Sequence, residues 1–202
     1  MKIVDVKQNT PEWYAAKCGI PSASEFDKII TAKGEPSKQR LKYLYKKAGE
    51  RASKITEETY QNNNMLRGKE LEDEARKLYC FMKNVKVKQT GFCVTDKEPI
   101  YGCSPDGVVP MCGLLEIKCP IMSTHVGYLM GNKLPSEYFP QIQGQLLVTG
   151  RKWVDFFSYY PGLKPLIVRV YRDKTFLRLL EPELTKFCHE LNQLAKKIRR
   201  DK

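Results

Sequence analysis

One stretch of the chain, residues 102–120, constrains the fold more than any other because it sets charged side chains into an apolar run. It reads GCSPDGVVPMCGLLEIKCP, with Asp106 in a Ser-Pro-Asp-Gly turn and with Glu116 and Lys118 alternating in GLLEIKC. An apolar run of this length, bounded by Gly and Pro, predicts a strand of the sheet core. Its register is fixed, because a slip of one residue would turn every side chain to the other face.

The alternation decides which side chains share a face of this strand. Residues two apart point the same way, so we expect Glu116 and Lys118 to project together with Leu114. The core side then takes Leu115, Ile117 and Cys119. An acid and a lysine on an apolar strand need a further charged partner to offset their desolvation, and Asp106 adds a second carboxylate. Two hard oxygen ligands suit Mg²⁺, which keeps several waters and binds substrate phosphate.

Such a metal lowers the pKa of a bound water, and Lys118 could position or activate that water, so the stretch predicts phosphodiester hydrolysis. The alternative is that Asp106 only forms a turn and that Glu116 and Lys118 form an exposed ion pair. That alternative does not explain the apolar flanks of the two charged residues.

The charge of the chain favours a polyanionic partner. Thirty-five Lys and Arg residues against 23 Asp and Glu give a net charge of +12. Nucleic acid is the expected partner, since each phosphate neutralised by a cation releases counterions, although ribosomal and membrane-surface proteins share such a composition. No apolar run approaches the ~18 residues of a membrane span, and the N-terminus has no apolar signal region. We expect a soluble, cytoplasmic protein without a membrane partner.

The cysteines and histidines predict no metal site of their own. Seven cysteines form no C-x-x-C pair, so we expect reduced, mostly buried thiols. His125 and His189 belong to no motif, and we assign both to the surface or to satisfied packing.

The expected elements begin with helices. The first starts at Thr10-Pro11 and stops before Gly19, and a short one with a capping box at Ser22–Glu25 reaches residue 30. A helix over 37–55 should bury Leu41, Leu44, Tyr45 and Ala48. A helix over 65–82 should bury Leu71, Ala75, Leu78 and Met82.

Strands and two more helices follow. We expect several strands between residues 85 and 118, with PIYGCS and GLLEIKC as neighbours in one sheet. A helix capped by Ser136 should end at Gly150, strands should cover 152–160 and 165–172, and a last helix should open at Glu181-Pro182. This order predicts an α/β or α+β sandwich forming one domain over 1–202.

Asp106 followed about ten residues later by Glu116-Ile117-Lys118 resembles the signature of the PD-(D/E)xK nucleases. Further motifs, in residues 13–25, 67–79 and 138–150 and in CSPDG and LEIKCP, occur in the order found in the phage lambda exonuclease, or YqaJ-type viral recombinase, family. The resemblance covers about residues 11–160, and a strand and helix over 165–200 follow. It implies a restriction-endonuclease-like core, a mixed central β-sheet flanked by helices.

The resemblance also implies roles for single residues. Asp106 and Glu116 would be metal ligands, with the backbone carbonyl of Ile117 as a third, and Lys118 would act on the attacking water. The expected cofactor is Mg²⁺, as two ions, with Mn²⁺ as a substitute.

Two further catalytic positions lie on helices. Helical spacing leaves Glu72 and Glu74 as equal candidates, because they flank the apolar arc on opposite sides, and the family pattern selects Glu72. Gln141 matches the family's helix glutamine and would orient the water, with Gln143 as the alternative. Tyr138 either borders the site or packs in the core.

A 5′-phosphate pocket is expected from Lys17, Ser22, Ser24 and Ser104. Lys17 closes one helix while Ser22 and Ser24 open the next, so that a cation, hydroxyls and free N–H groups could converge on an anion. Family members often carry Arg where this chain has Lys17, and lysine lacks the bidentate fork of arginine.

The resemblance implies a Mg²⁺-dependent 5′-to-3′ exonuclease that digests one strand of linear double-stranded DNA and leaves 3′ tails for phage-type homologous recombination. It also implies a ring-shaped homotrimer, a single-strand annealing protein as partner, and a phage or prophage origin in a bacterial host cell. The alternatives are a structure- or sequence-specific endonuclease of the same fold and a non-catalytic DNA-binding module.

Overall fold

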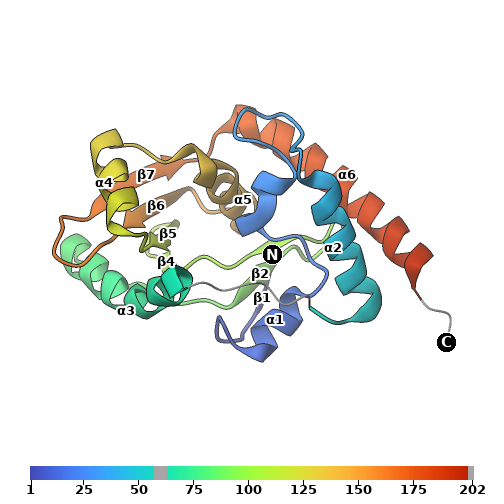
Figure 1. Ribbon diagram of the computed structural model, residues 1–202, viewed down its shortest axis with the longest axis horizontal. Coiled ribbons are helices and arrows are strands. Elements are labelled where there is room, and N and C mark those ends of the chain that lie inside the picture. Colours follow the sequence, from blue (N-terminus) through green and yellow to red (C-terminus); the bar gives the residue numbers. More distant parts are fainter. Residues whose placement is uncertain (57–62, 200–202) are drawn as a thin grey trace.

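A four-stranded mixed sheet forms the centre of the protein, which we describe from a computed structural model covering residues 1–56 and 63–199, with side chains from 66 onward in the second range. The strands lie in the order β4 (Gly107–Val109), β5 (Gly113–Lys118), β6 (Trp153–Ser158), β7 (Leu166–Tyr171). β5 and β6 are parallel, and the other two pairs are antiparallel. The predicted fold class, a mixed sheet flanked by helices, is confirmed (Figure 1).

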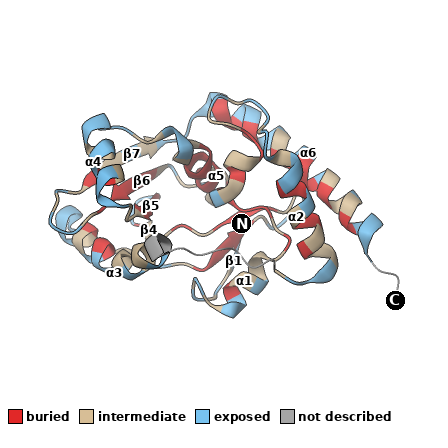
Figure 2. Cartoon of the chain, viewed as in Figure 1, coloured by how far each residue is buried: buried red, intermediate tan, exposed pale blue. Residues whose placement is uncertain are grey.

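Helices cover both faces of β5. On one face α3 (Asn63–Lys83) packs Ala75 and Tyr79 into a cluster with Leu115 and Ile117. On the other face α5 (Phe139–Thr149) joins a cluster around Leu114. The strand is accordingly buried along its length (Figure 2). Glu116 shares the face of Leu114, as predicted, and α5 covers that face.

A second sheet contains β1 (Lys2–Val4), β2 (Phe92–Val94) and β3 (Gly102–Cys103). The prediction that PIYGCS and GLLEIKC are neighbours is wrong, because β3 pairs with β2 and β5 pairs with β4 and β6. The turn at Ser104-Pro105-Asp106 separates the two sheets. Pro105 has no N–H to continue the ladder, which ends β3 after two residues.

The remaining helices lie around the two sheets (Figure 1). They are α1 (Pro11–Lys17), the 3₁₀ helix η1 (Ala23–Lys28), α2 (Arg40–Ser53), α4 (Met122–Gly131), the 3₁₀ turn η2 (Ser136–Tyr138) and α6 (Lys174–Ile198). The predicted first helix is confirmed, with the Thr10 hydroxyl accepting from the Trp13 N–H. α2 packs along α6 through Leu44, Ala48, Leu184 and Leu191.

Two helix faces differ from prediction. On α2, Leu41 and Tyr45 are more than half exposed, at 56% and 58%, whereas Lys47 and Glu50 are buried as an ion pair. Apolar periodicity cannot reveal a buried face that is made of paired charges. On α3 the buried residues include Ala75 and Tyr79, and the predicted Met82 is exposed.

Three helix starts also differ. α6 begins at Lys174, seven residues before the predicted opening, because the Asp173 carboxylate caps the Phe176 N–H and the apolar face continues upstream. Ser22 makes no side-chain cap, so the predicted capping box is absent, and the short helix there is 3₁₀. α5 starts at Phe139 after η2, and Gly150 ends it in the left-handed conformation, as predicted.

The cysteines are free, but fewer are buried than predicted. Cys93, Cys103 and Cys188 are buried, Cys112 is exposed, and the others are half-buried. Among the helices of the described ranges, none has the length and apolar character to cross a membrane.

Candidate active site

The three residues of the opening motif meet at the end of β5. The Ile117 N–H donates to Asp106 Oδ2 at 2.6 Å, which ties the turn before β4 to the adjoining strand. Lys118 Nζ lies 2.5 Å from Glu116 Oε1. The structure therefore brings Asp106, Glu116 and Lys118 together, and Ile117 lines the same cleft.

Glu116 is buried and held by several donors. The residue is 2% exposed. Oε1 accepts from Lys118 and from Gln141 Nε2, each at 2.5 Å, and Oε2 accepts from Gln145 Nε2 at 2.5 Å. A carboxylate out of water requires such donors, and together they fix its orientation.

The three glutamines of α5 have different environments. Gln141, the predicted site residue, contacts Glu116, whereas Gln143 donates to the Tyr171 carbonyl and accepts from the Asp173 N–H. Gln145 was not predicted. Its position four residues after Gln141 places both on one helical face, which is the sequence signal that could have identified it.

The structure separates Glu72 from Glu74. Glu72 lines the cleft with Asp106 and Lys118. Glu74 instead accepts a hydrogen bond from the Tyr159 hydroxyl. The choice that helical spacing left open is resolved in favour of Glu72 as the carboxylate next to the motif.

Arg76 also belongs to this site, although the sequence did not predict it. Its side chain is buried, with NH2 2.5 Å from Glu72 Oε1 and a further ion pair to Asp73. Its Nε donates to the Asp106 carbonyl at 3.3 Å. The spacing of four residues between Glu72 and Arg76 was the available signal.

Two of the three acids, Glu72 and Asp106, line a cleft of about 350 Å³. Its lining includes Gln8, Glu72, Asp106, Lys118 and Tyr138, and a second hollow along the N-terminal segment shares Gln8, Asn9, Lys69, Glu72 and Asp106 with it. Tyr138 lines the cleft and also packs against Phe156 in the core. It therefore occupies both of the positions predicted as alternatives, at the border of the site and in the core.

Burial and charge repulsion together set the electrostatics of the cleft. Burial, and then the charges of Glu116 and Glu72, raise the pKa of Asp106 well above its usual range. Burial also raises the pKa of Glu72, although Arg76 opposes this effect. Burial by itself lowers the pKa of Lys118, but Glu116 and Asp106 outweigh it and raise that pKa above its usual range.

The residues present fit a hard divalent cation. Asp106 and Glu116 offer carboxylate oxygens, and a cation between them would relieve their mutual repulsion. In the part of the chain that the structure describes, no three His, Cys, Asp or Glu side chains form a complete cage. A small donor set of this kind suits Mg²⁺, which retains waters, better than Zn²⁺.

The predicted phosphate pocket is partly assembled. Lys17 Nζ lies 3.8 Å from the centre of the Trp13 ring, and Trp13 Nε1 donates to Ser104 Oγ at 2.9 Å. The pKa of Lys17 is lowered to about 8, by burial and by the nearby charge of Lys47. The structure thus links Lys17 to Ser104 through one aromatic ring.

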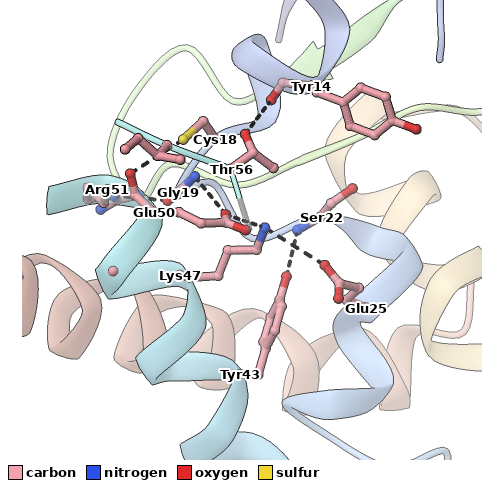
Figure 3. Close-up of polar contacts among 12 residues, drawn as sticks. Tyr14, Cys18, Gly19, Ser22, Glu25, Tyr43, Lys47, Glu50, Arg51 and Thr56 are labelled. Carbon is pink, nitrogen blue, oxygen red and sulfur yellow. Dashed lines mark hydrogen bonds and ion pairs between the residues drawn. The ribbon is translucent and has the colours of Figure 1, made fainter. Parts of the chain in front are cut away.

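The two remaining pocket residues differ from each other. Ser22 is buried, and its hydroxyl has no hydrogen-bond partner among the described residues. Its N–H donates to the Tyr43 hydroxyl, beside the ion pairs of Lys47 with Glu50 and Glu25 (Figure 3). Ser24 is exposed on η1, and it does not join Ser22 in the buried part of the predicted pocket.

The histidines do not enter the site. His125 is buried, with Nδ1 2.7 Å from Ser158 Oγ and Nε2 3.1 Å from the Lys164 carbonyl, and His189 is exposed. The predictions of satisfied packing and of a surface position are confirmed.

Comparisons with known proteins point to one family. A model described as the YqaJ-like viral recombinase domain matches residues 12–152. The alkaline exonuclease LHK-Exo from Laribacter hongkongensis is 33% identical, with a TM-score of 0.86 over 95% of this chain and 97% of that chain. The same values hold for LHK-Exo in complex with dAMP.

More distant matches agree in fold or in part of the sequence. A phage-related exonuclease from Haemophilus somnus is 15% identical, with a TM-score of 0.69 over 92% of this chain and 99% of that chain, and so shows the fold alone. The uncharacterized protein R354 of Acanthamoeba polyphaga mimivirus is 27% identical over 170 residues, which cover 78% of this chain and 30% of R354. The match spans less than a third of that relative's length.

Proposed function

This chain belongs to the YqaJ-like viral recombinase family, and we propose that it is a metal-dependent exonuclease acting on linear double-stranded DNA. The observation that carries the proposal is the meeting of Asp106, Glu72 and Lys118 in one cleft, with Glu116 buried beneath it and paired with Lys118. Its likeness to LHK-Exo supports the nuclease activity, and the net charge of +12 supports a DNA partner.

Each residue has a proposed part in the hydrolysis. Bound Mg²⁺ would supply a water of lowered pKa and neutralise charge on the phosphate. Asp106, Glu116 and the Ile117 carbonyl would hold the metal, and Mn²⁺ would substitute. Lys118 would position the attacking water, and Glu72 would take a proton or hold a second ion. Gln141 would keep Glu116 in place through its 2.5 Å hydrogen bond.

The direction and the biological role are part of the proposal. We infer digestion of one strand from 5′ to 3′, with a 5′-phosphate held by Lys17, Ser22 and Ser104 and with 3′ tails left for recombination. A ring-shaped homotrimer, a single-strand annealing partner and a phage or prophage setting in bacterial cytoplasm complete it.

One digestion tests the activity. Linear duplex labelled at the 5′ ends or at the 3′ ends, and closed circular duplex, are incubated with Mg²⁺ or with chelator. We expect loss of the linear duplex with Mg²⁺ alone, early release of the 5′ label, and intact circles. Cutting of the circles would favour an endonuclease, and DNA binding without cutting would favour the non-catalytic module. Light scattering that finds only monomer at micromolar concentration would contradict the trimer.

A further inference from the structure

The N-terminal segment, residues 2–10, lies before the matched family region and yet contributes residues to the lining of the catalytic cleft. Gln8 and Asn9 line both hollows together with Glu72 of α3. The segment thus contributes to the immediate surroundings of the acids, although no motif of the sequence points to it.

The segment is fixed in place by close contacts with β2. Lys2, Ile3 and Val4 pair with Val94, Cys93 and Phe92. A Cβ on Gly91 would lie 2.2 Å from the Val4 carbonyl oxygen, so the approach of the two backbones requires glycine there. The Thr10 hydroxyl donates to the Lys7 carbonyl at 2.9 Å and closes the loop before α1.

Gln8 connects this segment to the loop that carries Asp106. Its Nε2 donates to the carbonyls of Thr90 and Pro105, both at 2.9 Å. The Pro105 carbonyl belongs to the peptide group that enters Asp106, and Arg76 donates to the carbonyl of the peptide group that leaves it. Hydrogen bonds from Gln8 and Arg76 therefore hold the peptide groups before and after Asp106. The Asp106 carboxylate itself accepts a hydrogen bond through Oδ2 from the Ile117 N–H.

From this arrangement we propose that Gln8 is a positioning residue, which aims the Asp106 carboxylate at the metal by holding the Pro105 peptide. The proposal rests on the proposed metal-dependent function. Groups that orient a metal ligand typically affect metal affinity or activity by about 10- to 100-fold when they are lost. The effect should fall on metal binding and turnover rather than on DNA binding, because Gln8 contacts the backbone next to a ligand.

Two variants of Gln8 and one matched control test the proposal. Gln8→Glu and Gln8→Met keep the size of the side chain and remove the amide donor, and Gln193→Glu makes the same charge change on the exposed surface of α6. The measurements are Mn²⁺ affinity by calorimetry without DNA, kcat and KM on linear duplex, and the melting temperature in chelator. We expect Mn²⁺ affinity and kcat to fall roughly 10-fold in both Gln8 variants, with KM and the Gln193 control unchanged. Excess Mn²⁺ should restore part of the turnover.

Several outcomes would overturn the role. Wild-type Mn²⁺ affinity and kcat in both Gln8 variants would do so, as would a rise in KM alone. Failure of both variants to fold would show that Gln8 is structural instead. Absence of metal-dependent digestion in the wild-type protein is a separate result, which would refute the proposed function itself.

Discussion

Gln145 Nε2 lies 2.5 Å from Glu116 Oε2 and donates a hydrogen bond to this second oxygen of the buried carboxylate. Gln145 lies one helical turn beyond Gln141, which donates to the first oxygen. Gln141 and Gln145 together fix both oxygens of Glu116 from α5. The orientation of this proposed metal ligand is therefore set by a rigid helix.

Replacing Gln145 should lower turnover, whereas replacing Gln143 should not. Gln145→Leu removes a donor from a buried carboxylate, and we expect kcat to fall by about 10-fold or more. Gln143→Leu removes hydrogen bonds to Tyr171 and Asp173 and serves as a control two residues away. Both should lose about 1–3 kcal/mol of unfolding free energy. Steady-state kinetics and chemical denaturation measure the two effects, and equal kcat values would contradict the assignment.

The two glutamates of α3 offer a second matched comparison. Glu72→Gln should lower kcat by about 100-fold or more, because the carboxylate at the cleft is lost. Glu74→Gln should leave kcat near wild type, since it changes only the contact with Tyr159. Equal small losses in single-turnover digestion would remove Glu72 from the site.

Asp106→Asn should abolish activity and yet stabilise the metal-free protein. The pKa of Asp106 is raised in the folded state, so its ionisation opposes folding, and stability falls as pH rises from the unfolded toward the folded pKa. Asparagine removes that penalty and can still accept from the Ile117 N–H. We expect a higher melting temperature than wild type at pH 8 in chelator.

Added Mn²⁺ should reverse this order, because it binds the folded wild-type protein and raises its melting temperature. An Asp106→Asn variant that melts below wild type in chelator would show that the repulsion among the acids is unimportant.

Lys118→Ala, which leaves Asp106 and Glu116 intact, should remove most of the activity, and near-normal turnover would exclude the proposed role of Lys118.

The parts of the fold that sequence could predict are those set by local pattern. GLLEIKC was identified as a strand because its apolar run is continuous, and α1 because Thr10 and Pro11 mark its start. The start of α6 was misplaced because Pro182 resembles a helix opening, whereas it lies inside a longer helix. Lys47 and Glu50 were missed as buried residues because, although they pair three positions apart on one helix, only the tertiary structure covers them.

In the candidate site too, residues placed by local pattern could be predicted and residues placed by long-range contacts could not. Asp106, Glu116 and Lys118 could be found from spacing because a turn and one strand carry all three. Gln8 could not, because its partner Pro105 is 97 positions away in the sequence. Contacts of that range depend on how β1 joins the second sheet, and the pattern of residues 2–10 gives no sign of it.

The last prediction concerns the choice of DNA end and its pH dependence. Duplex with a 5′-phosphate should be digested faster than duplex with a 5′-hydroxyl, and Lys17→Ala should narrow that ratio more than it lowers the basal rate. Lys17 has its pKa lowered to about 8, so it is charged at pH 7 and becomes neutral as pH rises through that value. The 5′-phosphate remains doubly charged over this range, since its second pKa is about 6. The preference for the 5′-phosphate should therefore shrink between pH 7 and pH 9.5, and using the ratio of the two rates cancels any effect of pH on the hydrolysis itself.

The Lys17→Arg variant should keep its preference for the 5′-phosphate throughout this pH range, because arginine stays protonated. Ser22→Ala, at the buried hydroxyl, should narrow the ratio more than Ser24→Ala at the exposed one. A wild-type ratio that stays constant with pH would mean that Lys17 does not hold the 5′-phosphate.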